Sequence, residues 1–205
     1  MSEGYATIAE TDEVRAAQVR LGSRRARART GSPVTASSSD PEPRDPLTDF
    51  ERAFVAARDG FYIGSVSSDG WPYVQFRGGP PGFVHSSDEH TLAWADFRGN
   101  RQYLSTGNIA GDERVSLFFM DYPNQIRLKI FGRARTLDAA DDADLVAELV
   151  VPGYRAIVEQ AVVVTVVAYD WNCPQHITPR YSAPELQALL ASSPDPGGLA
   201  RQLFE

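Results

Sequence analysis

The sequence predicts a mainly β protein, a small barrel of six or seven antiparallel strands with a few peripheral helices. Between residues 61 and 135, short runs that alternate apolar and polar side chains are separated by Gly, Pro, Asp and Ser turns. Residues 161–169 form a near-continuous β-branched run, which is typical of a strand buried on both faces. Because the strands follow one another through short turns, the order favours an antiparallel barrel over βαβ units.

Length and composition set the class of protein. The chain has 205 residues, of which 42% are apolar and 10% aromatic, enough to bury a core and to exclude wholesale disorder. The longest apolar run, residues 161–169, is far shorter than the roughly 20 residues that span a bilayer, and the N-terminus lacks an apolar signal-peptide core. We therefore expect a cytoplasmic protein with no membrane partner.

The charge balance bears on the expected partners. Twenty basic and 27 acidic residues give a net charge of −7, which argues against general affinity for nucleic acid. Lys129 is the single lysine, so nearly all basic groups are arginines, whose planar forks bind phosphate in a bidentate manner wherever they converge. A small-molecule substrate is the expected partner.

The chain divides into three predicted parts: an N-terminal arm (1–46), a central domain (47–182) and a C-terminal helical tail (183–205). Within the arm, residues 14–30 hold six arginines and no acid, with apolar residues at helical spacing, and residues 31–46 are rich in Ser and Pro. This pattern predicts a short basic helix and a flexible stretch. The arm either binds nucleic acid or lies across an acidic surface of its own protein or of a partner subunit.

The elements of the central domain follow from local patterns. Thr48 and Glu51 form a capping-box pattern that begins a helix over residues 47–58. Residues 68–70 are a hairpin turn between two strands. The predicted strands are 61–67, 72–77, 83–85, 91–96, 115–121, 125–135 and 161–169, and the other predicted helices are 102–106, 138–151 and 185–191.

A candidate phosphate-binding loop spans residues 94–102, between a strand and a predicted helix. Asn100 can cap that helix, so that its first amides point outward with the positive end of the helix dipole. Arg98 and Arg101 add two guanidinium groups, and Gly99 lets the backbone approach a ligand. The alternative is two surface arginines on a loop.

Two cations mark the strand 125–135. Alternation places Ile126, Leu128 and Ile130 on the core face, and Arg127 and Lys129 together on the other. These two side chains either line the same pocket as the phosphate loop or belong to an exposed outer face.

The polar loop after the buried strand, residues 171–180, offers further chemistry. Trp171 can stack, His176 can titrate and Arg180 can bind an anion. Cys173 and His176 have a metal-like spacing, but the chain has no second cysteine, so we expect no metal site and expect Cys173 to be a small buried hydrophobe. The chain also lacks the G-x-G-x-x-G fingerprint, a Walker loop and a nucleophile elbow.

Several stretches, in this order, carry a family resemblance: Asp-Gly-Trp-Pro-Tyr at 69–73, Gln75 to Gly82, 95–103, 115–121, 127–135 and 171–180. With them, the region from about Phe50 to Arg180 resembles the pyridoxamine 5'-phosphate oxidase-like group of FMN-binding split β-barrels. Arg-Gly-Gly-Pro-Pro-Gly at 77–82 and Asn-Cys-Pro-Gln-His-Ile at 172–177 are its more specific stretches.

The resemblance implies a homodimeric split barrel with two FMN sites at the subunit interface. It implies that Gln75 and Arg77 line the flavin and that the loop after the next strand holds the phosphate. That loop usually reads Ser-Arg-Lys, whereas this chain has Asn100-Arg101-Gln102, so Arg98 is expected to replace the missing charge. The cofactor-binding residues expected on this basis are Gln75, Arg77, Asp96, Phe97, Arg98, Asn100, Arg101, Gln102, Arg127, Lys129 and Trp171.

One departure from the family bears on the substrate. The true oxidases end in an Arg-x-His pair that grips pyridoxamine phosphate, whereas here His176 precedes Arg180 at a different spacing. We therefore expect an FMN-dependent oxidoreductase with another small substrate, for which His176 and Arg180 are the candidate catalytic residues. The alternatives are a non-catalytic flavin-binding or electron-relay protein, and a split barrel that binds F420 or haem.

Overall fold

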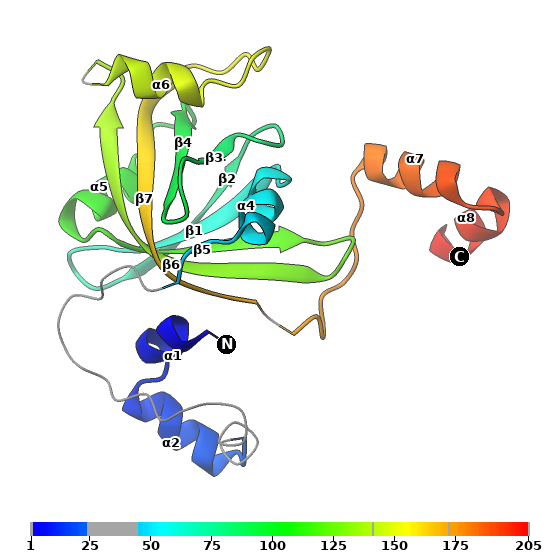
Figure 1. The fold of residues 1–205 in the computed structure, drawn as a ribbon, viewed down its shortest axis with the longest axis horizontal. Coiled ribbons are helices and arrows are strands. Elements are labelled where there is room, and N and C mark those ends of the chain that lie inside the picture. Colours follow the sequence, from blue (N-terminus) through cyan, green and yellow to red (C-terminus); the bar gives the residue numbers. More distant parts are fainter. Residues whose placement is uncertain (1, 24–44, 141, 172, 205) are drawn as a thin grey trace. The chain divides into compact units, whose positions relative to one another are not determined.

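Seven strands form a single sheet in the order β2-β1-β5-β6-β7-β4-β3 (Figure 1). The computed structural model describes residues 2–23, 45–140, 142–171 and 173–204. The strands are β1 (Gly60–Val66), β2 (Pro72–Gly78), β3 (Val84–Ser86), β4 (Thr91–Phe97), β5 (Arg114–Asp121), β6 (Ile126–Asp138) and β7 (Val158–Trp171). The predicted mainly β, antiparallel architecture is confirmed.

The core lies on the inner face of this sheet, where alternate residues of each strand meet. Phe61 of β1 pairs with Phe119 of β5, and its ring also packs edge-on against Trp94 of β4 at 5.0 Å between centroids. On β6, Leu128 and Ile130 are fully buried, as the alternation predicted, while Arg127 and Lys129 lie on the other face. Burial of these large side chains is the main contribution to the stability of the barrel.

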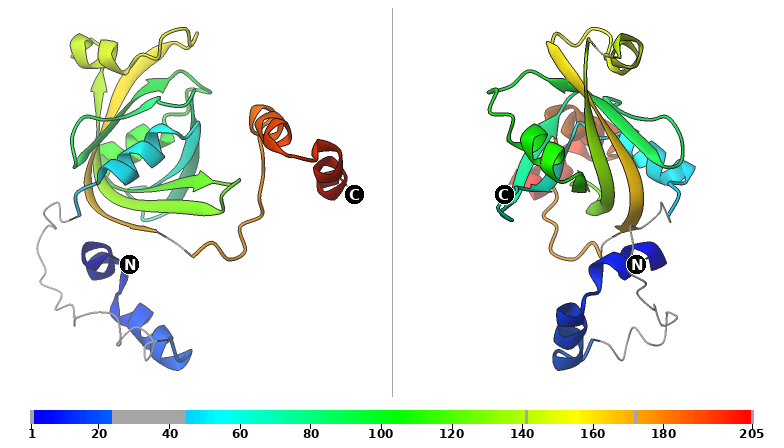
Figure 2. Two further views of the ribbon diagram at one scale, coloured as in Figure 1. Left: turned by 45° about the vertical axis from the view of Figure 1, so that its right-hand side comes forward. Right: turned by 90° about the vertical axis from the view of Figure 1, so that its left-hand side faces the viewer.

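The sheet curls because its two longest strands bend. The pairing of β6 with β7 shifts register between Phe131 and Gly132. A Cβ at Gly132 would lie 2.5 Å from Cγ1 of Val164, so only glycine permits the close approach of the two strands at this bulge. Figure 2 shows the resulting curvature, which turns the sheet into a split barrel.

Helices cover the ends and edges of the barrel. α4 (Asp49–Ala56) begins with the predicted capping box, in which the Thr48 backbone N–H donates to the Glu51 carboxylate at 3.0 Å. α6 (Ala143–Leu149) buries Val146 and Leu149 against β4 and β7. The predicted helix over 138–151 was wrong in its first part, because β6 continues to Asp138 by pairing with β7 and the helix starts only after Asp142.

The N-terminal residues form two helices, α1 (Glu3–Ala9) and α2 (Asp12–Arg20). The sequence did not predict α1. The helix predicted over residues 14–30 is present from Asp12 to Arg20, and its remainder from residue 24 onward lies outside the described residues, as does most of the predicted flexible stretch.

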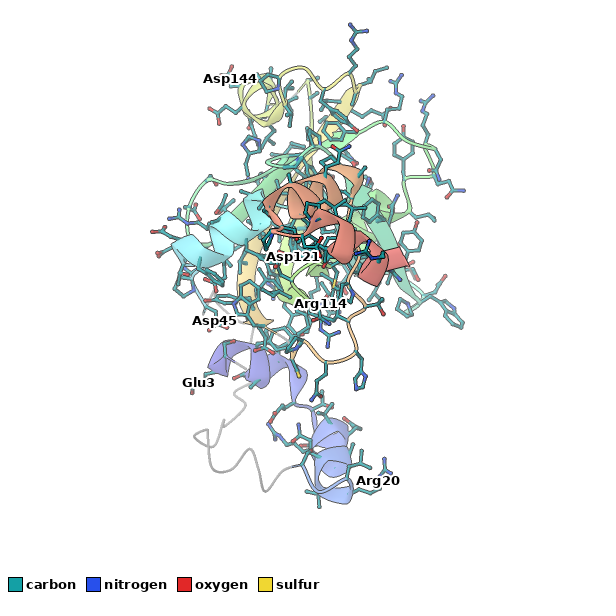
Figure 3. The ribbon with its side chains drawn as sticks, turned by 90° about the vertical axis from the view of Figure 1, so that its right-hand side faces the viewer. Glu3, Arg20, Asp45, Arg114, Asp121 and Asp144 are labelled. Carbon is teal, nitrogen blue, oxygen red and sulfur yellow. The ribbon has the colours of Figure 1, made fainter. Side chains whose placement is uncertain are left out.

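Tyr5 docks α1 onto the outer face of the barrel. Its ring is 7% exposed and stacks on Phe131 of β6, with 4.5 Å between centroids. The Ser2 hydroxyl lies 2.6 Å from the backbone carbonyl oxygen of Tyr169 and 2.7 Å from Oδ2 of Asp45. Figure 3 shows Asp45 beside this helix. The contacts join residues far apart in the sequence, which is why local patterns did not reveal them.

The chain divides into two compact units, of which the second comprises residues 121–126 and 173–205. Within it, the Gln125 side-chain amide donates to the carbonyl oxygen of Ile177 at 2.6 Å. α7 (Ala183–Ser192) has a capping box formed by Ser182 and Glu185, and α8 (Pro196–Phe204) follows it in the predicted helical tail. None of the helices in the described part of the chain is long and apolar enough to cross a bilayer.

Candidate functional site

A buried polar network joins three strands and a helix of the first unit. Arg77 of β2 donates from Nη1 to Oδ1 of Asp96 on β4 at 2.6 Å. The side-chain amide of Gln160 on β7 donates to Oδ2 of Asp96 at 2.8 Å and to Oγ1 of Thr106 at 2.9 Å. Asp96 is 7% exposed, so its charge is held by the guanidinium and the amide rather than by water.

The same network fixes the helix that follows β4. α5 (Leu104–Gly111) carries Ser105, whose hydroxyl donates to Oε1 of Gln75 on β2 at 2.7 Å, and Thr106, which meets Gln160. Two expected flavin-lining residues, Gln75 and Arg77, therefore contact the residues that begin α5 and end β4. This polar network of Gln75, Arg77, Asp96, Ser105, Thr106 and Gln160 is the centre of the candidate site.

The loop between β4 and α5, residues 98–103, differs from the sequence prediction. Asn100 does not cap the helix; its Oδ1 accepts from the backbone N–H of Gln102 at 3.1 Å and tightens the loop. Arg101 and Tyr103 have φ angles of 61° and 53°, in the left-handed region, so the helix begins only at Leu104. The prediction of a helix over 102–106 was wrong in its start, because these two residues interrupt the helical backbone.

Arg98 and Arg101 both lie close to Glu159, an acidic residue that was not among the predicted site residues. Nε of Arg98 lies 2.7 Å from Oε1 of Glu159 on β7, and Nε of Arg101 lies 4.0 Å from the same oxygen. The Tyr103 hydroxyl donates to Glu159, with 3.1 Å to Oε2, and accepts from Nε of Arg101 at 3.1 Å. The hydrogen bond from Arg98 is the main cause that lowers the pKa of Glu159, and the hydrogen bond to Tyr103 raises the pKa of Arg101.

Two features of this region fit a phosphate-bearing ligand such as FMN. No side chain caps the N-terminus of α5, so its first amides remain available to an anion next to Arg98 and Arg101. Among the described residues, Nε of Arg77 is buried and has no hydrogen-bond partner. An unpaired buried donor is costly, and a polar ligand atom would satisfy it.

The other cations expected near a flavin lie in different surroundings within the first unit. Nζ of Lys129 is 3.4 Å from Oδ2 of Asp170 and 4.4 Å from the centroid of the Tyr5 ring. Arg127 is half-buried on the same face of β6. Lys129 thus contacts the docked N-terminal helix and β7, and its contacts are with residues other than those of the polar network.

Trp171 ends β7 and packs against α4. Its indole N–H donates to Oε1 of Glu51 at 2.8 Å, and its ring meets Phe54 edge-on with 4.8 Å between centroids. Burial raises the pKa of Glu51, but the hydrogen bonds from Thr48 and Trp171 outweigh it and lower the pKa overall. Trp171 therefore ties the end of the sheet to the capping box of α4.

The candidate catalytic residues belong to the second unit. His176 is exposed and has a φ angle of 64°, and the Arg180 guanidinium lies over the Tyr122 ring at 5.1 Å from its centroid. Cys173 is exposed, so the expectation of a small buried hydrophobe was wrong; it stands outside the buried strand, in the polar loop that follows β7.

Sequence reasoning missed Glu159 and Gln160, although a signal was present. Two polar residues stand directly before the apolar run 161–169 and belong to the same strand, β7. Because strand residues alternate between faces, Glu159 and Gln160 point to opposite sides, one toward the arginines and one into the polar network. Ser105 and Thr106 were missed because their partners, Gln75 and Gln160, lie 30 and 54 residues away in the sequence.

Comparison with known proteins identifies the family. Residues 47–169, more than half of the chain, match the family described as Pyridoxamine 5'-phosphate oxidase. No curated protein matches the sequence. HupZ of Group A Streptococcus is similar in structure, with a TM-score of 0.51 and 11% identity over 66% of this chain and 100% of that chain. An FMN-binding protein from Syntrophomonas wolfei has a TM-score of 0.47 and 11% identity over 60% of this chain and 85% of its own.

The sequence match and the architecture agree. The matched region runs from the residue before the capping box of α4 almost to the end of β7, and so covers the whole barrel of the first unit. The likeness to HupZ concerns the fold. The chain belongs to the pyridoxamine 5'-phosphate oxidase family and has the split-barrel fold.

Proposed function

We propose that this protein is an FMN-dependent oxidoreductase that works as a homodimer on a small substrate. One observation carries the proposal: the polar network joins Gln75 and Arg77 to the start of α5, next to the loop that bears Arg98 and Arg101. These are the positions at which the family resemblance expects the flavin and its phosphate. Membership of the family supports the same assignment.

Each part of the site has a separate task in this proposal. Arg98, Arg101 and the free amides of α5 hold the phosphate, and the turn made by Asn100 and Gln102 sets the loop conformation. Gln75, Arg77 and Asp96, followed by Phe97, line the flavin. When bound, FMN would supply the hydride and electron transfer, so the side chains bind and orient.

The remaining site residues are assigned on the resemblance. Arg127 and Lys129 tune the charge near the ring, although Lys129 already has Asp170 as its counter-ion. The resemblance implies that Trp171 and Arg180 come to the site from the partner subunit. His176 and Arg180 contact the substrate or move a proton.

An exposed apolar surface supports the homodimer. The outer face of β1 and β2 carries Val74 and Phe76, which are 65% and 57% exposed. Tyr62 of β1 pairs with Phe76 across the hairpin and extends the same face. We call these three residues the outer hairpin face. A contiguous exposed apolar surface of this kind marks an interaction site, and a second copy would cover it.

The test of the proposal is FMN binding by a double variant, Arg98→Ala with Arg101→Ala. Its affinity should fall at least about tenfold, because two charge-assisted contacts to phosphate are lost at a partly exposed site. The matched control is Arg52→Ala with Arg114→Ala, which removes the same net charge from two ion pairs elsewhere. Equal FMN affinity of both double variants would rule out the assigned phosphate loop.

Turnover separates an enzyme from an electron-relay protein. The FMN-loaded protein should be reduced rapidly by a nicotinamide or another small donor and reoxidised by an acceptor. A protein that binds FMN but shows no substrate-dependent turnover would be a flavin carrier. A protein that binds F420 or haem in preference to FMN would contradict the cofactor assignment.

A further inference from the structure

Glu159 lies close to both loop arginines that the proposed function assigns to the phosphate of the ligand. Its Oε1 accepts from Nε of Arg98 at 2.7 Å, and Tyr103 holds both carboxylate oxygens. The side chain of Glu159 is 19% exposed, whereas those of Arg98 and Arg101 are 44% and 64% exposed. The carboxylate therefore lies beneath two guanidinium groups that face outward.

The charges of Arg98, Arg101 and Glu159 partly cancel one another when no ligand is bound. Two guanidinium groups and one carboxylate leave a single positive charge on the loop. The pKa of Glu159 is lowered, mainly by the Arg98 hydrogen bond, so the carboxylate stays ionised at neutral pH. A phosphate at Arg98 and Arg101 must either displace this carboxylate or lie against it, and both cost binding energy.

We propose that Glu159 is an internal counter-ion of the phosphate loop, which competes with the phosphate of a ligand for Arg98 and Arg101 and so lowers the affinity of the loop for that phosphate. The proposal rests on the proposed function, since it concerns the same phosphate loop. A neutral ligand, such as a flavin without its phosphate, cannot replace the carboxylate and gains nothing from the loop. A dianion offers the two arginines more charge than Glu159 does, and the exchange favours binding.

A role for Glu159 in ordering the loop would predict a change of phosphate affinity in the opposite direction. If the carboxylate served to hold Arg98 and Arg101 in a geometry ready for phosphate, its removal would loosen the loop and weaken binding. A counter-ion competes with the ligand, so its removal strengthens binding. The sign of the change in affinity therefore decides between the two.

The test compares Glu159→Gln with the wild-type protein at constant ionic strength. The probes are FMN, riboflavin and inorganic phosphate, measured by flavin fluorescence and, for phosphate, by the shift in the thermal unfolding midpoint. Glu159→Gln should bind FMN and phosphate about fivefold more tightly, because one competing charge is removed, and riboflavin with unchanged affinity. Glu113→Gln is the matched control, since Glu113 forms a similar exposed pair with Arg133, 2.6 Å apart, beyond the other end of α5.

The outcomes separate this inference from the proposed function. Unchanged or weaker binding of FMN and phosphate by Glu159→Gln would overturn the inference, even where the Arg98 and Arg101 double variant loses FMN. Tighter phosphate binding by Glu159→Gln, in a protein that does not bind FMN, would support the counter-ion and refute the flavin. An equal gain in Glu113→Gln would show only a general effect of net charge and would also overturn the inference.

Discussion

Several carboxylates in this chain accept hydrogen bonds from arginines, and Asp112 shows how such bonds affect the stability of the folded protein. Its side chain follows α5 and accepts from the backbone N–H of Arg114 at 3.0 Å and from Nε of the same residue at 2.9 Å. The hydrogen bonds from Arg114 lower the pKa of Asp112 to about 2. A carboxylate whose pKa is lower in the folded state stabilises that state while it is ionised and ceases to do so when it is protonated.

We expect Asp112→Asn to change how stability depends on pH. The folded protein binds fewer protons at this site than the unfolded chain between pH of about 4 and about 2, so the contribution of Asp112 is present above this window and is lost as the pH falls through it. Urea unfolding should show Asp112→Asn to be less stable than the wild type at pH 6 and to converge with it toward pH of about 2. A difference between the two proteins that is constant with pH would contradict the assignment.

At the residue scale, the sequence revealed the arginines of the site and Asp96, but not Glu159 and Gln160, which bind them. Arg98 and Arg101 stand out because they are close together after a strand. Glu159 and Gln160 are distant from their partners, 61 residues from Arg98 and 64 from Asp96. Only the antiparallel pairing of β4 with β7 brings these groups together, and a single sequence does not state which strands pair.

Among the elements, α1 depends most on contacts from other parts of the chain. It has seven residues, too few to be stable alone in water, so packing must hold it. The Tyr5 ring supplies that packing through Phe131, and the Lys129 ammonium lies 4.4 Å from the centroid of the same ring. Burial, with a smaller effect from Asp170, raises the pKa of Tyr5.

Tyr5→Ala should release α1 from the barrel. The loss of a buried, stacked ring is expected to lower the free energy of unfolding by about 2 kcal/mol and to increase hydrogen exchange over α1. Tyr5→Phe is the control, because it keeps the ring that stacks on Phe131. Equal exchange over α1 in Tyr5→Ala and Tyr5→Phe would show that the ring does not dock the helix.

At this scale, the sequence predicts elements whose signals are local. The capping box of α4 and the hairpin of β1 and β2 were confirmed because their partners lie within a few residues. The start of α5 was wrong because Arg101 and Tyr103 have left-handed φ angles and interrupt the helical backbone. The start of α6 was wrong because pairing with β7 extends β6.

For the whole molecule, the outer hairpin face is the clearest sign of a larger assembly. Tyr62, Val74 and Phe76 lie on one side of a two-stranded hairpin at the end of the strand order. An exposed sheet edge with apolar side chains invites association, and closed dimers are the commonest way in which chains cover such surfaces.

Val74→Glu should weaken the proposed homodimer. A carboxylate at the centre of an apolar interface is desolvated without a partner, so the dissociation constant should rise at least about a hundredfold. Val19→Glu on α2 is the matched control, because Val19 and Val74 are 61% and 65% exposed. Sedimentation of both variants over a range of concentrations measures the effect, and a monomeric wild type would refute the dimer itself.

The sequence predicts the barrel as a whole, but it does not predict the order of the strands. Alternation along β5 and the apolar run in β7 define which residues are buried. In the order β2-β1-β5-β6-β7-β4-β3, β1 and β4 are not neighbours, and β7 lies between β4 and β6. The lengths of the segments that connect the strands do not determine which strands become neighbours. That order creates the polar network, of which the sequence predicted only Gln75, Arg77 and Asp96, and those singly.

The three tryptophans lie in three different environments. Trp94 is 1% exposed in the core, Trp71 is 76% exposed in the turn between β1 and β2, and Trp171 joins β7 to α4. Each indole is thus a built-in optical reporter for one process: collapse of the barrel, burial of the hairpin, or attachment of α4. Variants that keep a single tryptophan allow intrinsic fluorescence to follow each process separately in one sample.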